Sequence, residues 1–320
     1  MNLPLFIARR MRFNPKHKGS VSVQIIKIAK LAVALGMAMI LIAVATGKGL
    51  QKEIQDKTVA FNGHLVVAPF ENSESQISVL PIANDPTVLE MLKNEAGVQH
   101  VQGVALKGGL LKAGDQFEGV VMKGVSQDYQ WQVLKSFMVE GNYPQLRDQT
   151  SNEILLSKLI AQRLSVGVGD EVSAYFQNSQ NQQLPNVRKF KIVGLFLSGF
   201  PDFDENFVLG DLRHIQRINK WKNDEIGAYE VFTTDLKTSI NIASSIYQKL
   251  PSDLDVIEIT RQYASIFQWI SLFDFNILII IIVMIVVGVI NMSTALLVLI
   301  LERSSMIGLY KSLGANNRMI

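Results

Sequence analysis

An uninterrupted apolar run near the C-terminal end constrains this chain more than any other feature. Residues 275–301 contain no charged side chain. A helix needs only about 20 predominantly apolar residues to cross the hydrocarbon core of a bilayer. A second apolar run covers residues 31–47, and the residues between the two runs have an ordinary soluble composition. The sequence therefore predicts two membrane-spanning helices, at 28–47 and 273–301, on either side of a large domain at 48–272.

The charges are distributed unevenly along the chain. Residues 1–30 carry seven basic side chains and no acidic one, and residues 302–320 carry three basic and one acidic. Removing these from the totals of 31 basic and 28 acidic residues leaves 21 basic and 27 acidic between them. Basic flanks stay in the cytoplasm. We therefore expect a multi-pass protein of the inner membrane, with both ends of this sequence in the cytoplasm and the large domain in the periplasm.

The N-terminal segment, residues 1–27, has two interpretations. Leu3, Ile7 and Met11 recur every four residues among arginines, which predicts a basic amphipathic helix on the lipid surface. A disordered basic tail is the alternative. A nucleic-acid patch is disfavoured because the charges adjoin an apolar span, and no nucleic-acid partner is expected. The apolar run that follows is favoured as an uncleaved anchor over a signal peptide.

Cysteine is absent, and the mean hydropathy of +0.21 is high because of the two apolar runs. The absence of cysteine excludes thiolate zinc sites and cysteine nucleophiles. A domain of this size without disulfides must be held together by its own core.

The central domain mixes strand and helix patterns. Alternating or short apolar runs predict strands at 64–68, 102–106, 170–176, 189–197 and 256–259, and a hairpin with arms at 110–113 and 117–123 around Gly114 and Asp115. Helical spacing predicts helices at 153–164 and 236–250. We expect an α+β domain, with two lobes, between the membrane helices.

A search for chemistry finds no catalytic constellation. There is no Walker A pattern, because Ile42 stands where its first glycine would be. The four histidines are isolated in sequence. Residues 202–206 resemble the start of a calcium loop but lack its glycine and its glutamate, so we interpret them as a solvated loop. We expect a non-catalytic chain with no metal and no cofactor of its own.

The second apolar run contains polar and small residues. Asn276 fits the membrane interface, whereas Asn291 lies deep in the run. Polar side chains in hydrocarbon seek partners on other helices, and glycine permits close approach. Gly288 and Asn291 are therefore the candidate residues for packing between spans.

Three blocks resemble one family of membrane proteins. Residues 302–315 read ERSSMIGLYKSLGA, which is similar to the pattern E-R-x-x-x-I-G-x-x-K-A-L-G-A that ends the second span in permeases of the MacB/LolC/FtsX superfamily of ABC transporters. Two upstream blocks of the superfamily are also similar to this chain, at residues 151–164 with 168–172 and at residues 190–196 with 202–207. The opening, residues 6–12 and 18–22, is most similar to the lipoprotein-releasing LolC/LolE branch.

This resemblance implies a mechanism. Such permeases have four spans, so the chain looks like one that stops before the third. The resemblance also implies that the segment after the second span is a coupling helix, seated on a separate ABC ATPase that binds the ATP. The coupling residues would be Glu302, Arg303, Met306, Gly308, Leu309, Lys311, Leu313 and Gly314. ATP-driven motion of these helices would change the posture of the periplasmic domain without a pore.

In the lipoprotein-releasing branch, a protruding loop docks a soluble carrier. The matching loop lies between the strands at 170–176 and 189–197, and its candidate docking residues are Gln177, Leu184, Pro185 and Arg188. A flexible polar loop without a partner is the alternative, because the tip has no aromatic residue.

The function we expect is that of a permease subunit that releases lipoproteins from the inner membrane to a periplasmic carrier. Its partners would be the ATPase, a second permease copy or homologue, lipoproteins, the carrier and membrane lipid. A MacB-like efflux permease or an FtsX-like permease is the alternative within the superfamily. A two-span sensor with a periplasmic ligand domain is the alternative outside it, and the glycines after residue 301 make a poor signalling coiled coil.

Overall fold

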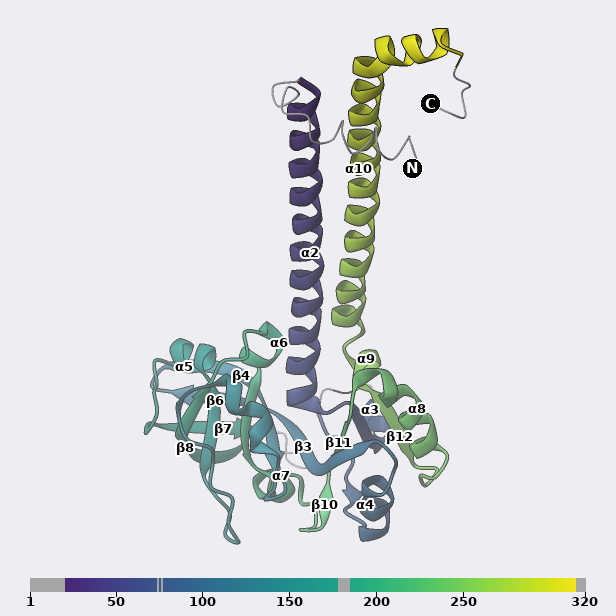
Figure 1. Ribbon diagram of the computed structural model, residues 1–320. Coiled ribbons are helices and arrows are strands. Elements are labelled where there is room, and N and C mark those ends of the chain that lie inside the picture. The colour runs from purple at the N-terminus through teal and green to yellow at the C-terminus, as the bar shows by residue number, and fades with distance from the viewer. Residues whose placement is uncertain (1–20, 74, 76, 178–184, 315–320) are drawn as a thin grey trace. The chain divides into compact units, whose positions relative to one another are not determined.

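The computed structural model describes residues 21–73, 75, 77–177 and 185–314. The chain divides into two compact units. One unit contains residues 1–52 and 268–320, and its described residues are mainly helical, so we call it the helical unit. The other contains residues 53–267, and we call it the globular unit. Figure 1 shows the elements of both units.

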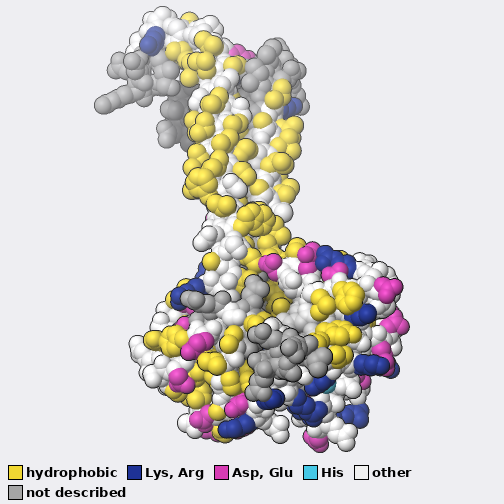
Figure 2. Space-filling model, turned by 180° about the vertical axis from the view of Figure 1, so that it is seen from behind, with side chains coloured by type: hydrophobic (Ala, Val, Ile, Leu, Met, Phe, Trp, Pro, Cys, Tyr) yellow, Lys and Arg dark blue, Asp and Glu magenta, His cyan; other side chains and the backbone are white. Residues whose placement is uncertain are grey.

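The helical unit consists mainly of two long helices, α2 (Val21–Asn62) and α10 (Ala264–Ser312). Both are long and apolar enough to cross a membrane. Their outward side chains are hydrophobic, whereas charged side chains are scattered over the globular unit (Figure 2). The prediction of two apolar helices flanking a mixed domain is confirmed by these elements.

Both helices continue beyond the expected span boundaries at 47 and 273. In α2 the reason is a change of pattern: Ile54, Thr58 and Phe61 recur at helical spacing and are buried. The helix stops at Gly63, which has φ +72° and donates its N–H to the carbonyl of Val59 at 2.7 Å. This left-handed residue is a common helix terminator. The structure does not test the expected domain boundaries, which stay predictions.

Among the described residues of the globular unit, the strands form one ten-stranded sheet and one two-stranded sheet. The large sheet contains β1 (Leu65–Pro69), β3 (Val98–Ala113), β4 (Gln116–Val125), β5 (Met138–Gly141), β6 (Glu153–Ser157), β7 (Glu171–Phe176), β8 (Asn186–Phe196), β9 (Phe207–Asp211), β11 (Ala228–Thr233) and β12 (Leu254–Glu258). The small sheet pairs β2 (Ile82–Ala83) with β10 (Glu225–Ile226).

Six strands close on themselves. Strand β3 pairs with β4, β4 with β9, β9 with β6, β6 with β8, β8 with β7, and β7 pairs again with β3. We call these six strands the ring. Closure leaves fewer free edges for pairing with other chains.

The first half of β3 belongs to a second arrangement, which we call the open sheet. Here β3 pairs through residues 98–104 with β11, β11 pairs with β1, and β1 pairs with β12. One 16-residue strand is therefore shared by the ring and the open sheet.

Amphipathic helices pack their apolar faces against these sheets. Helices α4 (Pro86–Lys93) and α8 (Leu236–Tyr247) bury apolar residues in the same core cluster as β1, β3 and β11. Helices α5 (Lys158–Leu164) and α7 (Leu212–Asn219) contribute to that cluster from the ring. The remaining short helices are α3 (Phe70–Ser73), η2 (Trp131–Phe137), α6 (Pro201–Asp204) and α9 (Ile259–Gln262).

Two expectations about this unit are wrong. Residues 153–157 form strand β6, so only residues 158–164 of the expected helix are helical. Ile154, Leu155 and Leu156 are all fully buried, and a continuous buried run suits a central strand. Ser157 then caps α5 by accepting a hydrogen bond from the N–H of Leu159 at 3.1 Å.

The expected solvated loop at residues 202–206 is also wrong. Residues 201–204 form α6, and Asp204 is buried. Its carboxylate accepts hydrogen bonds from the backbone N–H groups of Ser198 and Gly199, both at 2.8 Å. The acidic residue organises the chain between β8 and α6, because a buried carboxylate must have donors around it.

Candidate functional site

The two long helices pack through small residues of α2 within the helical unit. A Cβ atom added to Gly47 would lie 2.7 Å from Cδ1 of Ile277, and one added to Gly36 would overlap Cε of Met284. Small residues let helix backbones approach closely, which favours association in lipid. These two glycines were not singled out by sequence reasoning, although their spacing of 11 residues places them on one helical face.

A polar cluster closes one end of this packed face. Lys48 forms an ion pair with Asp274, with Nζ and Oδ1 2.5 Å apart. Gln51 donates to the same carboxylate oxygen and to the carbonyl of Ile270, each at 3.1 Å. These contacts fix the register of α2 against α10, because a slip by one turn would break all three of them.

The residues expected to pack between spans, Gly288 and Asn291, lie on α10 and are half-buried. A Cβ atom on Gly288 would meet nothing within 4 Å. Close packing at Gly288 against another span therefore stays a prediction, and within the helical unit Gly36 and Gly47 hold that role.

The expected coupling residues lie at the end of α10. Figure 1 shows the last turns of this helix, in yellow, lying across the direction of the turns before them. Leu309, Tyr310 and Leu313 are exposed, Leu313 to 76%. Gly314 has φ +92° and donates its N–H to the carbonyl of Lys311 at 3.0 Å, which ends the helix. The segment therefore presents a short apolar surface, and its contact with an ATPase stays a prediction.

The candidate carrier-docking loop is described only at its edges. Gln177 and Pro185 are exposed, and Arg188 lies on β8 opposite Ala174 of β7. Leu184, with the rest of residues 178–184, lies outside the described residues.

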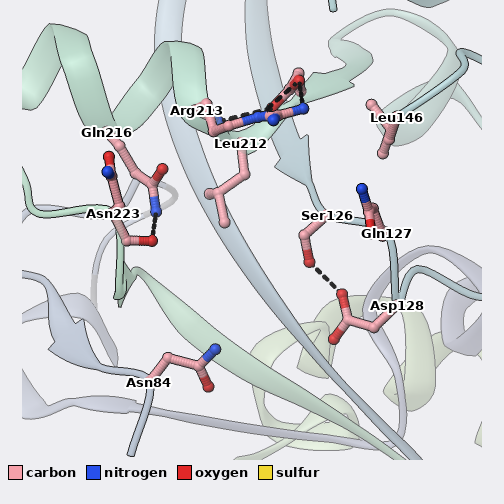
Figure 3. A pocket seen from close by; sticks show the side chains of 10 residues that line it. Asn84, Ser126, Gln127, Asp128, Leu146, Leu212, Arg213, Gln216 and Asn223 are labelled. Carbon is pink, nitrogen blue, oxygen red and sulfur yellow. Dashed lines mark hydrogen bonds and ion pairs between the residues drawn. The ribbon is translucent and has the colours of Figure 1, made fainter. Parts of the chain in front are cut away.

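A polar pocket of about 360 Å³ lies in the globular unit, between the end of β4 and the start of α7 (Figure 3). Arg213 forms an ion pair with Asp211 at 2.6 Å and donates to the carbonyls of three residues that precede β6, including Gln149 at 2.8 Å. On the opposite wall Asp128 accepts a hydrogen bond from Ser126. These charged groups thus bind other parts of the chain, and they do not point together toward a place where a ligand could bind.

The electrostatics of this pocket agree with that structural role. Burial raises the pKa of Asp211, but hydrogen bonds from Arg213 and from the N–H of Ser151 outweigh this and hold the pKa below its usual value. In the part of the chain that the structure describes, no group of three or more His, Cys, Asp or Glu side chains could hold a metal ion.

Comparison with known proteins identifies the family. The model of the MacB-like periplasmic core domain matches residues 28–262, which is more than half of the chain. The chain belongs to this family. The expected membership of the MacB/LolC/FtsX superfamily of ABC transporter permeases is confirmed.

Two curated relatives are similar over nearly the whole chain. The lipoprotein-releasing system transmembrane protein LolC of Xylella fastidiosa (strain Temecula1) is 23% identical over 321 residues, which cover 97% of this chain and 74% of the relative. The protein named LolE of Haemophilus influenzae (strain Rd) is 23% identical over 332 residues, covering 100% of this chain and 76% of the relative.

Among solved structures, the periplasmic region of MacB from Actinobacillus actinomycetemcomitans is 16% identical with a TM-score of 0.42, covering 65% of this chain and 92% of that one. The extracellular domain of the transporter YknZ is 13% identical with a TM-score of 0.41, covering 61% of this chain and 98% of that one.

Proposed function

We propose that the chain is part of an ABC transporter permease that releases lipoproteins from the inner membrane and works by mechanotransmission. The observation that carries the proposal is the similarity to proteins named LolC and LolE over 97% and 100% of this chain. This similarity extends beyond residues 28–262, which match the periplasmic core domain, and includes α10.

The arrangement of the helices supports the same proposal. The end of α10 exposes Leu309, Tyr310 and Leu313, which suits contact with a separate ATPase. We propose that the work of the chain is to transmit movement. The ATPase, a second permease, a lipoprotein and a periplasmic carrier are the proposed partners.

The test is to purify the full-length protein in mild detergent from its native membrane and to identify what remains bound. We expect an ABC ATPase together with lipoproteins or their carrier. The variant Leu309→Asp should lose most of the bound ATPase, because a carboxylate would enter an apolar contact. Ser305→Asp, an equally exposed position outside the expected contact set, is the control and should keep it.

Three outcomes would change the proposal. An ATPase found with an outer-membrane channel or a cell-wall hydrolase would favour a MacB-like or FtsX-like role. A good yield of protein without any ATPase would favour a membrane sensor. Equal ATPase binding by both variants would contradict the assignment of the coupling segment.

A further inference from the structure

A buried charged side chain lies where α2 enters the globular unit. Lys123 on β4 has no exposed surface, and Glu230 on β11 is 4% exposed. Moving charges out of water is costly unless they are paired and hydrogen-bonded. A lysine at such a place therefore needs an explanation from its contacts.

Each contact of Lys123 belongs to a different part of the unit. Its Nζ is 2.5 Å from Oε1 of Glu230, which lies in the open sheet. The same ammonium donates to the backbone carbonyl of Phe61, in the last turn of α2. Lys123 itself is a ring residue, paired with Leu106 of β3 and Leu209 of β9. One ammonium group thus joins the helix end, the ring and the open sheet.

The surrounding residues complete this connection. Gln102 of β3 donates to the second oxygen of Glu230 at 2.8 Å. The ring of Tyr129 lies 5.6 Å from the ammonium, within the range of a cation–π contact. Burial lowers the pKa of Lys123, and the carboxylate of Glu230 opposes that shift.

The end of α2 is held from its other side by aromatic packing. The ring of Phe61 stacks on Phe203 at 4.6 Å and lies 5.4 Å from Phe196 of β8. The last carbonyl groups of a helix lack partners within the helix and carry partial negative charge. A cation placed there satisfies a carbonyl that an apolar core would leave unpaired.

We propose that Phe61, Gln102, Lys123 and Glu230 form a mechanical joint through which the end of α2 moves the ring and the open sheet as one body. This role rests on the proposed permease function, since movement of α2 matters only if an ATPase drives it. Lys123 is a positioning residue in this scheme and contacts no cargo. Apolar packing alone would hold Phe61, but it lets a helix rotate or slide more easily than a hydrogen-bonded charge does.

The main test uses the double variant Lys123→Met/Glu230→Gln in the full-length protein with its ATPase in nanodiscs. Replacing a buried ion pair by groups of similar volume is often neutral for stability, so the variant is expected to fold. Residues 1–320 contain no cysteine, and any cysteine elsewhere in the full-length protein is replaced by serine. Spin labels can then be placed at Asp56→Cys on α2, with Lys237→Cys near the open sheet or Lys189→Cys on the ring. Electron–electron distance measurements then report how firmly the three parts are held together.

We expect narrow distance distributions in the wild type, unchanged by ATP, and broad or ATP-dependent ones in the double variant. The variant should hydrolyse ATP as before but release less cargo per ATP. The control Lys249→Met/Glu95→Gln removes an ion pair of 2.6 Å that does not involve α2, and it should behave as the wild type. Equally narrow distributions in the double variant, or broad ones in the wild type, would overturn the joint.

A second measurement needs no variant. Amide hydrogen exchange of the last turn of α2 should be as slow as that of β4 and β11, because a joint opens only when the sheets open. Exchange about a hundredfold faster than in these strands would overturn the proposal. The hydrogen-exchange measurement and the distance distributions recorded without ATP do not depend on whether an ATPase binds, so failure of the joint and failure of the permease function are distinguishable.

Discussion

At the scale of single residues, buried polar groups in this chain connect distant segments. His64 lies two residues after the end of α2, and its Nδ1 accepts a hydrogen bond from the backbone N–H of Thr233 at 3.0 Å. An imidazolium could not accept this bond, because both of its nitrogens carry protons. Burial accordingly lowers the pKa of His64 from 6.5 to about 4, although the charge of Asp235 opposes the shift.

This shift predicts a loss of stability in acid. Above pH 6.5 the histidine is neutral in the folded and the unfolded chain, and its contribution is constant. Between pH 6.5 and pH 4 only the unfolded chain binds the proton, so stability falls as the pH falls. The loss should be about 1–2 kcal/mol, after discounting for the partial exposure of the ring.

Thermal unfolding of the full-length protein at pH 7.5 and pH 5.0 measures this loss. The control His64→Asn keeps an acceptor for Thr233 but cannot titrate, so its dependence on pH should be weaker than that of the wild type. His214, whose pKa is also lowered mainly by burial, would account for the slope that remains. Identical slopes in the wild type and the variant would contradict the role of His64.

At the scale of elements, the two long helices depend on glycines that face the partner helix. Gly47→Leu would place a side chain where Ile277 lies, at a Cβ distance of 2.7 Å. Overpacking of this kind costs about 1–3 kcal/mol. The variant should lower the thermal midpoint of the protein in detergent.

Gly49→Leu is the matched control, because a Cβ atom there meets nothing within 4 Å. Both substitutions gain the same helix propensity over glycine, so their difference isolates the contact with α10. Equal midpoints would show that α2 and α10 do not pack through this face.

Sequence patterns predicted local elements better than the contacts between segments that are distant in the sequence. The hairpin around Gly114 and Asp115 was predicted correctly because both its turn and its alternating arms are local signals. The strand at 153–157 was missed because a short buried strand followed by a helix has the same apolar content as one longer helix. The contact between Lys123 and Glu230 could not be predicted, because the two residues are 107 positions apart in the sequence, on strands that each pair with β3.

At the scale of the whole molecule, the expected topology gives a direct prediction. Residues 1–320 contain no cysteine. With any cysteine elsewhere in the full-length protein replaced by serine, single cysteines can be introduced without a background. The experiment uses cells whose outer membrane has been made permeable and whose inner membrane is intact. In these cells, Asp253→Cys should react with a thiol reagent that cannot cross the inner membrane. Ser312→Cys should react only after the inner membrane is opened. Both positions are exposed, so access to the reagent depends on sidedness and not on burial.

Detergent treatment provides the control for this experiment. The same reagent after detergent treatment should label both cysteines to the same extent. Labelling of Ser312→Cys in cells with an intact inner membrane would place the end of α10 outside the cytoplasm, and the coupling assignment would then be wrong.

The pairing of β1 with β12 has a consequence for how the protein is made. Leu65 pairs with Glu258, so β1, the first strand after α2, cannot complete its pairing until β12, the last strand before α10, has been made. During synthesis from the N-terminus, nearly two hundred residues must be made after β1 begins before β12 is made. Until then β1 has an open edge that can pair with other chains, and such long-range pairing forms slowly. Of the described strands, β12 is the last to be made, and it completes the open sheet. Newly made chains therefore need protection from aggregation in the compartment where the domain folds.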